Sequence, residues 1–70
     1  MLSDLLMWNK IGRIVTLLSE RLGISSERAL DLFYSSRTNE RLHDNDTGLY
    51  LMSDLYIVDE LIMELRTTAN

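Results

Sequence analysis

The chain has 70 residues, no cysteine, no proline and a formal net charge of −4, and its 46% apolar and 26% charged residues are typical of a folded domain. The length allows a single domain, and without cysteine it has no disulfide or thiolate metal site, which leaves tight helix packing or association with another chain to stabilise it. The acidic balance disfavours nucleic-acid binding, which depends on a dense Lys and Arg surface.

Residues 4–22 are predicted to form the longest helix. Apolar residues recur there at three- and four-residue steps and form one stripe, made of Met7, Trp8, Ile11, Ile14, Val15, Leu18 and Leu22. Ser3 can cap the N-terminus, and Gly23 suits the left-handed backbone position that ends many helices. Lys10 and Arg13 are expected on the opposite, solvent-facing side.

Three further leucines, Leu5, Leu6 and Leu17, widen this stripe beyond what one small partner helix can cover. They form either a broad core face or a second contact surface, for a copy of the chain or for another protein. Trp8 and Phe33 are bulky enough to dominate either the core or an interface, and of these two places the core is favoured for both.

A second, shorter helix is predicted to start at Ser25, which can cap it, and to have the body SERALDLFYS. Ile24 and Ala29 have the spacing of a hydrophobic staple at its start. The inward face of this helix is expected to comprise Ala29, Leu30, Phe33 and Tyr34.

The segment 35–48 is the least regular part, because its many Ser, Thr, Asn and Asp side chains compete with helical hydrogen bonds. A fourth, short helical turn is expected near residues 38–43, anchored by Leu42, and is followed by a turn in which Gly48 has a positive φ. The run LYLM, residues 49–52, is expected to be extended, either packed on the domain or paired with its symmetry mate in a dimer.

The last helix is predicted over about residues 54–66, with Ser53 as its cap. Its apolar stripe comprises Leu55, Val58, Leu61, Ile62 and Leu65. The predicted fold class is therefore all-α. Residues 1–70 form one small three-helix domain, in which the first and last helices enclose the second and the segment 35–53 covers the open end.

Three stretches in the last two-thirds of the chain carry a family resemblance: ALDLFYSS (residues 29–36), LHDNDTGLY (42–50) and SDLYIVDELIMEL (53–65). Together they resemble a family of small bacterial proteins catalogued as domain of unknown function 3791. Members of that family are often encoded beside a larger protein similar to ADP-ribosyltransferase toxins. The resemblance therefore implies a small partner or antitoxin-like role, and it implies no catalytic residue.

The polar stretch around His43 holds the candidates for catalysis, with Asp44 and Asp46 beside it. Neighbours in sequence do not by themselves converge in a pocket, and so short a chain leaves little room for a ligand cavity of about 300 Å³. Neither an enzyme nor a small-molecule substrate is expected. Counting from Asp44, a calcium loop would have Gly48 at its fifth position and Leu55 at its twelfth, which fails the required spacing, so no metal or cofactor is predicted.

The alternative function is that of a small helix-turn-helix-like DNA-binding regulator. Residues 14–34 give a helix, a glycine and a second helix, as that motif requires. A helix that reads DNA should project several basic or amide side chains from its start, and here Arg28 stands alone near Glu27 and Asp31. The sequence therefore favours a protein partner over nucleic acid.

The N-terminal run MLSDLLMW is apolar, but it has Asp4 where a signal peptide requires positive charge. No run approaches the ~18 apolar residues of a membrane span. We therefore expect a cytoplasmic protein that does not bind membranes.

We expect the chain to act as a protein–protein interaction module, in the first place as a homodimer, with a protein encoded nearby as the other expected partner. Apolar surface of the first and last helices supplies the contact, tyrosines form its rim, and acidic side chains steer the approach of a basic partner. The candidate interface comprises Leu5, Leu6, Trp8, Leu17, Tyr34, Tyr50, Tyr56, Asp59, Glu60 and Glu64.

Overall fold

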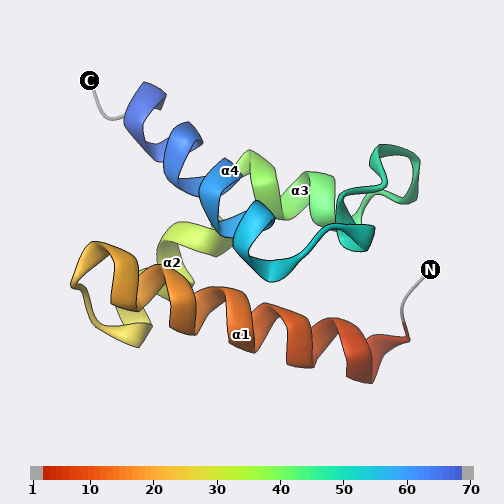
Figure 1. The fold of residues 1–70 in the computed structure, drawn as a ribbon, viewed down its shortest axis with the longest axis horizontal. Helices are drawn as coiled ribbons and strands as arrows, with labels where there is room; N and C mark the ends of the chain where they lie inside the picture. The colour runs from red at the N-terminus through yellow and green to blue at the C-terminus, as the bar shows by residue number, and fades with distance from the viewer. Residues whose placement is uncertain (1–2, 69–70) are drawn as a thin grey trace.

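The computed structural model describes residues 3–68, which form four α-helices and two short 3-10 turns (Figure 1). In chain order these are α1 (Asp4–Leu22), α2 (Ser26–Tyr34), α3 (Arg37–His43), η1 (Asn45–Thr47), η2 (Leu49–Leu51) and α4 (Asp54–Thr68). No strand occurs in this part of the chain, so the all-α prediction is confirmed, and the short fourth helix is present.

The two long helices, α1 and α4, pack directly on each other, and α1 also packs against α2 (Figure 1). The short α3 packs on α4 and α2. The sequence predicted that the first and last helices enclose α2, and this prediction is wrong, because α1 and α4 contact each other directly. The reason is that the inner face of α1 is broad enough to contact two helices, with Ile14 and Leu18 fully buried along its centre.

The ends of α1 and the start of α2 are as predicted. The Ser3 hydroxyl accepts a hydrogen bond from the N–H of Leu6 at 3.3 Å, and Gly23 ends α1 in the left-handed region with a φ of 65°. The Ser25 hydroxyl accepts from the N–H of Arg28 at 3.1 Å. The two serine hydroxyls accept from backbone N–H groups that the start of a helix leaves unpaired. The left-handed turn at Gly23 lets its own N–H bond to a carbonyl that the end of α1 leaves unpaired.

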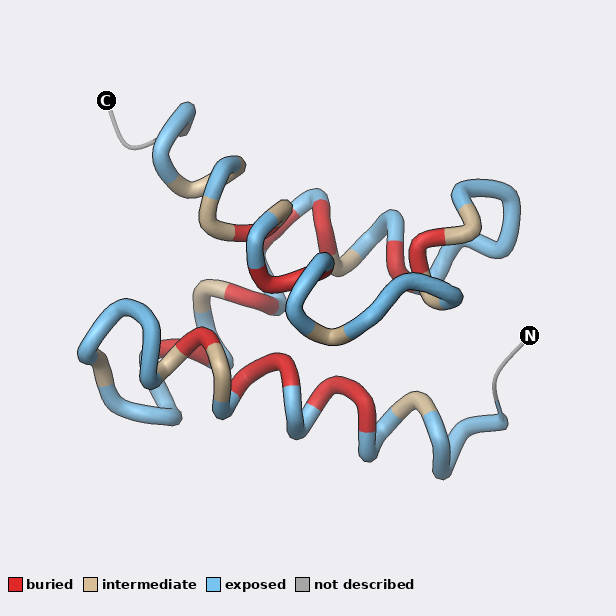
Figure 2. Tube along the Cα trace, in the orientation of Figure 1, coloured by how far each residue is buried: buried red, intermediate tan, exposed pale blue. Residues whose placement is uncertain are grey.

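The core follows the inner faces of α1, α2 and α4 and extends to α3 and η2 (Figure 2). Its buried apolar residues are Ile11, Ile14, Val15, Leu18, Ala29, Phe33, Leu42, Leu49, Ile57, Val58 and Leu61. Trp8 is not among them, because its residue surface is 63% exposed, so its predicted core position is wrong. With 9 residues α2 is about half as long as α1 with 19, and it is too short to cover the first turns of α1.

Only a narrow face of α2 is buried, formed by Ala29 and Phe33. Leu30 and Tyr34 were predicted to face inward, but they are 37% and 45% exposed. Each follows a residue of the buried pair by one position, which places it roughly 100° around the helix, on a flank that is partly open to solvent. Leu32, on the other flank, is the residue that packs against the core instead.

The segment between α2 and α4 is more regular than its composition suggested. The Ser36 hydroxyl caps α3 by accepting from the N–H of Asn39 at 3.0 Å, and Leu42 is buried as the predicted anchor. Gly48 has a φ of 68°, as expected. Residues 49–51 form the 3-10 turn η2 and not an extended segment, because the N–H of Leu51 bonds to the Gly48 carbonyl and so needs no strand partner.

Helix α4 begins after Ser53, whose hydroxyl accepts from the N–H of Tyr56 at 3.1 Å, as predicted. It continues to Thr68, past the predicted end at residue 66. Its buried face contains Ile57 together with Val58 and Leu61, whereas Leu55, which the predicted stripe included, is 51% exposed. The face is rotated because α4 packs on α3 as well as on α1.

Candidate interaction surfaces

The first turns of α1 present three large apolar side chains to solvent. Leu5, Leu6 and Trp8 are 70%, 53% and 63% exposed, so the structure leaves all three available for contact. Leu17, which the sequence grouped with them, is half-buried and packs against the core. Of the three leucines that widen the apolar stripe, Leu17 thus belongs to the core, whereas Leu5 and Leu6 are open to solvent.

The three tyrosines lie on three different elements. Tyr34 on α2 and Tyr56 on α4 are exposed, at 45% and 47%. Tyr50 on η2 is half-buried and packs against the core. Of the predicted aromatic rim, only Tyr56 lies on the same helix as the predicted acidic residues.

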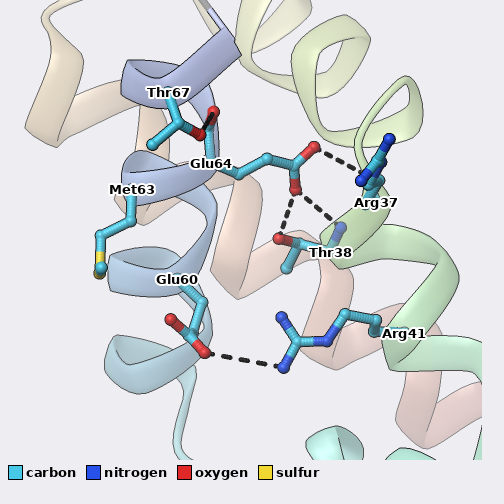
Figure 3. A pocket seen from close by; sticks show the side chains of 7 residues that line it. All are labelled: Arg37, Thr38, Arg41, Glu60, Met63, Glu64 and Thr67. Atoms are coloured by element: carbon cyan, nitrogen blue, oxygen red, sulfur yellow. Dashed lines mark hydrogen bonds and ion pairs between the residues drawn. The ribbon is translucent and has the colours of Figure 1, made fainter.

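The acidic side chains of α4 are paired within the chain. A carboxylate oxygen of Asp59 lies 3.3 Å from Arg21 Nη1, and one of Glu60 lies 3.6 Å from Arg41 Nη2 (Figure 3 shows the second pair). Such exposed pairs contribute little stability, but they lower the net negative charge of this surface. The sequence did not indicate these pairs, because Arg21 and Arg41 are far from the two acids along the chain.

Glu64 of α4 forms hydrogen bonds to the start of α3. One of its carboxylate oxygens accepts from the N–H of Arg37 at 2.8 Å, and the other accepts from the N–H and the hydroxyl of Thr38 at 2.9 and 2.7 Å (Figure 3). Burial raises the pKa of Glu64, but these hydrogen bonds outweigh it, so its pKa lies below the ordinary value of 4.5. Glu64 thus acts as a second N-terminal cap of α3, in addition to Ser36. No local sequence motif indicates this contact, because Glu64 is 26 residues away from Thr38 in the sequence.

Acid titration of Glu64 gives a testable prediction. The folded pKa is lower than the unfolded one, so the carboxylate stabilises the fold fully above about pH 5 and this contribution is lost as the pH falls through the folded pKa. We expect Glu64→Gln to lower the free energy of unfolding by about 1–2 kcal/mol at neutral pH, and by progressively less below about pH 4. Urea unfolding followed by circular dichroism across this pH range measures the difference.

The control for that measurement is Glu40→Gln, because Glu40 is an exposed residue of α3. Asp54 titrates with the same sign as Glu64, but it is present in both proteins and cancels in the comparison. A difference between wild type and Glu64→Gln that stays constant with pH would show that the charge of Glu64 does not stabilise α3.

A partly buried ionic network joins α1 to the start of α4. Lys10, predicted to face solvent, is 8% exposed, and its ammonium donates to the Met52 carbonyl at 2.9 Å and to Asp54 at 3.0 Å. The Arg13 guanidinium donates to the second oxygen of Asp54 at 2.6 Å. Burial raises the pKa of Asp54, and the hydrogen bonds and charges of Arg13 and Lys10 more than offset it, so the pKa is lowered.

Two open grooves lie on either side of Met63, which is itself 61% exposed. The smaller, of about 320 Å³, lies between α3 and α4 and is lined by Arg37, Thr38, Arg41, Glu60, Met63, Glu64 and Thr67 (Figure 3). The larger, of about 450 Å³, lies between the end of α1 and α4 and is lined by Arg21, Leu22, Asp59, Ile62, Met63 and Arg66. Both grooves open to solvent along a helix, a shape suited to a protein surface more than to an enclosed small molecule.

The residues considered for catalysis, metal binding and DNA binding lie in different parts of the structure. His43 is exposed at the end of α3, and within residues 3–68 no cluster of three or more His, Cys, Asp or Glu side chains could hold a metal ion. Arg28 is exposed near the start of α2, next to Glu27. No helix in the described part of the chain has the length and apolar character needed to cross a membrane.

Comparison with models of known protein families, with curated proteins and with solved structures finds no match to this chain.

Proposed function

We propose that the protein is a protein–protein interaction module and that its first partner is a second copy of itself. The observation that carries this proposal is the amount of apolar surface that the fold leaves open: among residues 3–68, eleven large apolar residues are at least 37% exposed. Single exposed leucines are ordinary on a protein surface, but so many on so small a domain favour a contact that covers part of them.

The proposed mechanism is burial of this apolar surface between two chains. A typical stable interface covers about 800 Å² on each partner, roughly a sixth of the 4759 Å² surface of this chain. Two exposed aromatic side chains, Trp8 and Tyr56, belong to the residue types that most often dominate the binding energy of interfaces. Burial of apolar surface also supplies the stabilisation that a cysteine-free chain of this size cannot obtain from disulfides.

Light scattering during gel filtration tests the proposal. We expect a mass of about twice the 8.1 kDa of the chain at high concentration, falling toward one chain on dilution. A chain that stays monomeric at about millimolar concentration would contradict self-association. The open apolar surface would then be assigned to a different protein, of the kind encoded beside relatives of the resembled family.

DNA binding gains no support from the surfaces described. Arg28 projects from α2 beside an acidic residue, and three further arginines, Arg13, Arg21 and Arg41, form ion pairs with carboxylates of α4. Their positive charge is therefore compensated inside the chain and is not presented as a surface for a phosphate backbone.

A further inference from the structure

The larger groove has an apolar floor between two helices. Leu22 at the end of α1 and Ile62 on α4 line it, and the exposed Met63 stands at its edge. A flexible methionine side chain is well suited to fill such a groove on another protein surface, because it adapts to an irregular shape. The chain thus carries on neighbouring residues both a projecting apolar side chain and a hollow that accepts one.

Two opposite charges bracket this apolar centre on α4. Asp59 and Arg66 are seven residues apart, which is about two helical turns or 10.5 Å, so they share one flank of the helix. Asp59 pairs with Arg21, yet its side chain remains 62% exposed and can accept a further hydrogen bond. Within residues 3–68 no ion pair forms to Arg66.

We propose that this groove receives α4 of a second copy in antiparallel orientation, with the two-fold axis crossing α4 between Ile62 and Met63. The proposal rests on the self-association proposed above and names its surface. The axis lies midway between Asp59 and Arg66, so Asp59 of each chain faces Arg66 of the other chain. Asp59 then lies between two arginines, Arg21 of its own chain and Arg66 of the second copy. Each Met63 enters the groove of the other chain, beside Ile62 and Leu22.

The order of charges selects this occupant and this orientation. A two-fold contact uses the same surface on both chains, so that surface must be complementary to itself. Among the residues of α4 that line the groove, a negative group is followed by an apolar centre and then by a positive group, and this order fulfils the condition when the second helix runs antiparallel. A parallel arrangement would instead place Asp59 against Asp59 and Arg66 against Arg66, which costs free energy.

Charge reversal at these two positions tests the proposal. Arg66→Asp places two carboxylates opposite each other at both ends of the contact, so we expect the dissociation constant of the dimer to rise about tenfold. Asp59→Arg should have a similar effect. The double variant, D59R with R66D, restores opposite charges across the axis, but the introduced arginine lies beside Arg21 of its own chain. We therefore expect the dissociation constant to recover only part of the loss seen in the single variants. Sedimentation equilibrium measures these constants, and circular dichroism verifies that each variant is folded.

Arg28→Asp is the matched control, because it makes the same charge change on an exposed residue of α2 outside the groove. We expect it to leave the dissociation constant unchanged. If Arg66→Asp dimerises like this control, or if the double variant dimerises no better than either single variant, the proposed surface is wrong while self-association stands. If the wild-type chain is monomeric, self-association and this surface are both wrong.

Discussion

Replacing Phe33 by alanine is expected to remove most of the stability of the fold. Phe33 is fully buried in the core, on the narrow face of α2. Truncating a buried phenylalanine typically costs about 3–5 kcal/mol, through lost apolar burial and the cavity that remains. A domain of 70 residues has a total stability of roughly 4–10 kcal/mol, so the variant should be largely unfolded at modest urea concentrations.

The neighbouring residue provides the control for this prediction. Tyr34 has its ring centroid 5.6 Å from that of Phe33, but it is 45% exposed, so Tyr34→Ala should cost only about 1 kcal/mol. Urea unfolding followed by circular dichroism at one fixed protein concentration compares the two, because self-association would make stability depend on concentration. Equal losses in the two variants would mean that α2 does not bury Phe33 as described.

Replacing Asp54 by alanine is expected to have the second-largest effect. The change leaves the Lys10 ammonium in a site where its side chain is only 10% exposed, with the Met52 carbonyl as its remaining acceptor. Removing one partner of a fully buried ion pair costs about 3–5 kcal/mol. Asp54 is partly open to solvent, with 23% of its side chain exposed, so we expect about 2–3 kcal/mol here.

The other half of the pair supplies the comparison. Lys10→Met keeps the apolar stem of the side chain, removes the buried positive charge and leaves Asp54 paired with Arg13 at 2.6 Å. Its cost is expected to stay within about 1 kcal/mol, because no unpaired buried charge results. Measured together in urea, the two variants separate the penalty of an unpaired charge from the value of the pair. A Lys10→Met variant as unstable as Asp54→Ala would show that the pair itself stabilises the fold strongly.

The helix ends were predicted well because capping is a local interaction. Ser3, Ser25 and Ser53 each accept a hydrogen bond from the backbone N–H three residues on, and Gly23 and Gly48 adopt the positive φ that glycine favours. All of these depend on residues within one helical turn, so the amino-acid order alone contains the information.

The surface was predicted in part. Leu5 and Leu6 were recognised as more apolar surface than one neighbour could cover, and they are exposed. The groove that contains Asp59 was not predicted, because its other side is formed by the end of α1. Arg21, which lies there, is 38 residues away from Asp59 in the sequence. Periodicity shows how apolar each helix is, but it does not show which charged side chain of another helix lies opposite.

By itself the sequence determined the all-α class, the limits of the long helices and the excess of apolar surface, because these follow from local hydrogen bonding, helical periodicity and composition. Only the tertiary structure decided that α1 packs directly on α4, that Lys10 is buried and that Glu64 caps α3. The reason is that each of these features joins residues more than 20 positions apart. Which distant groups meet depends on how the helices pack, and the pattern within one helix does not specify this.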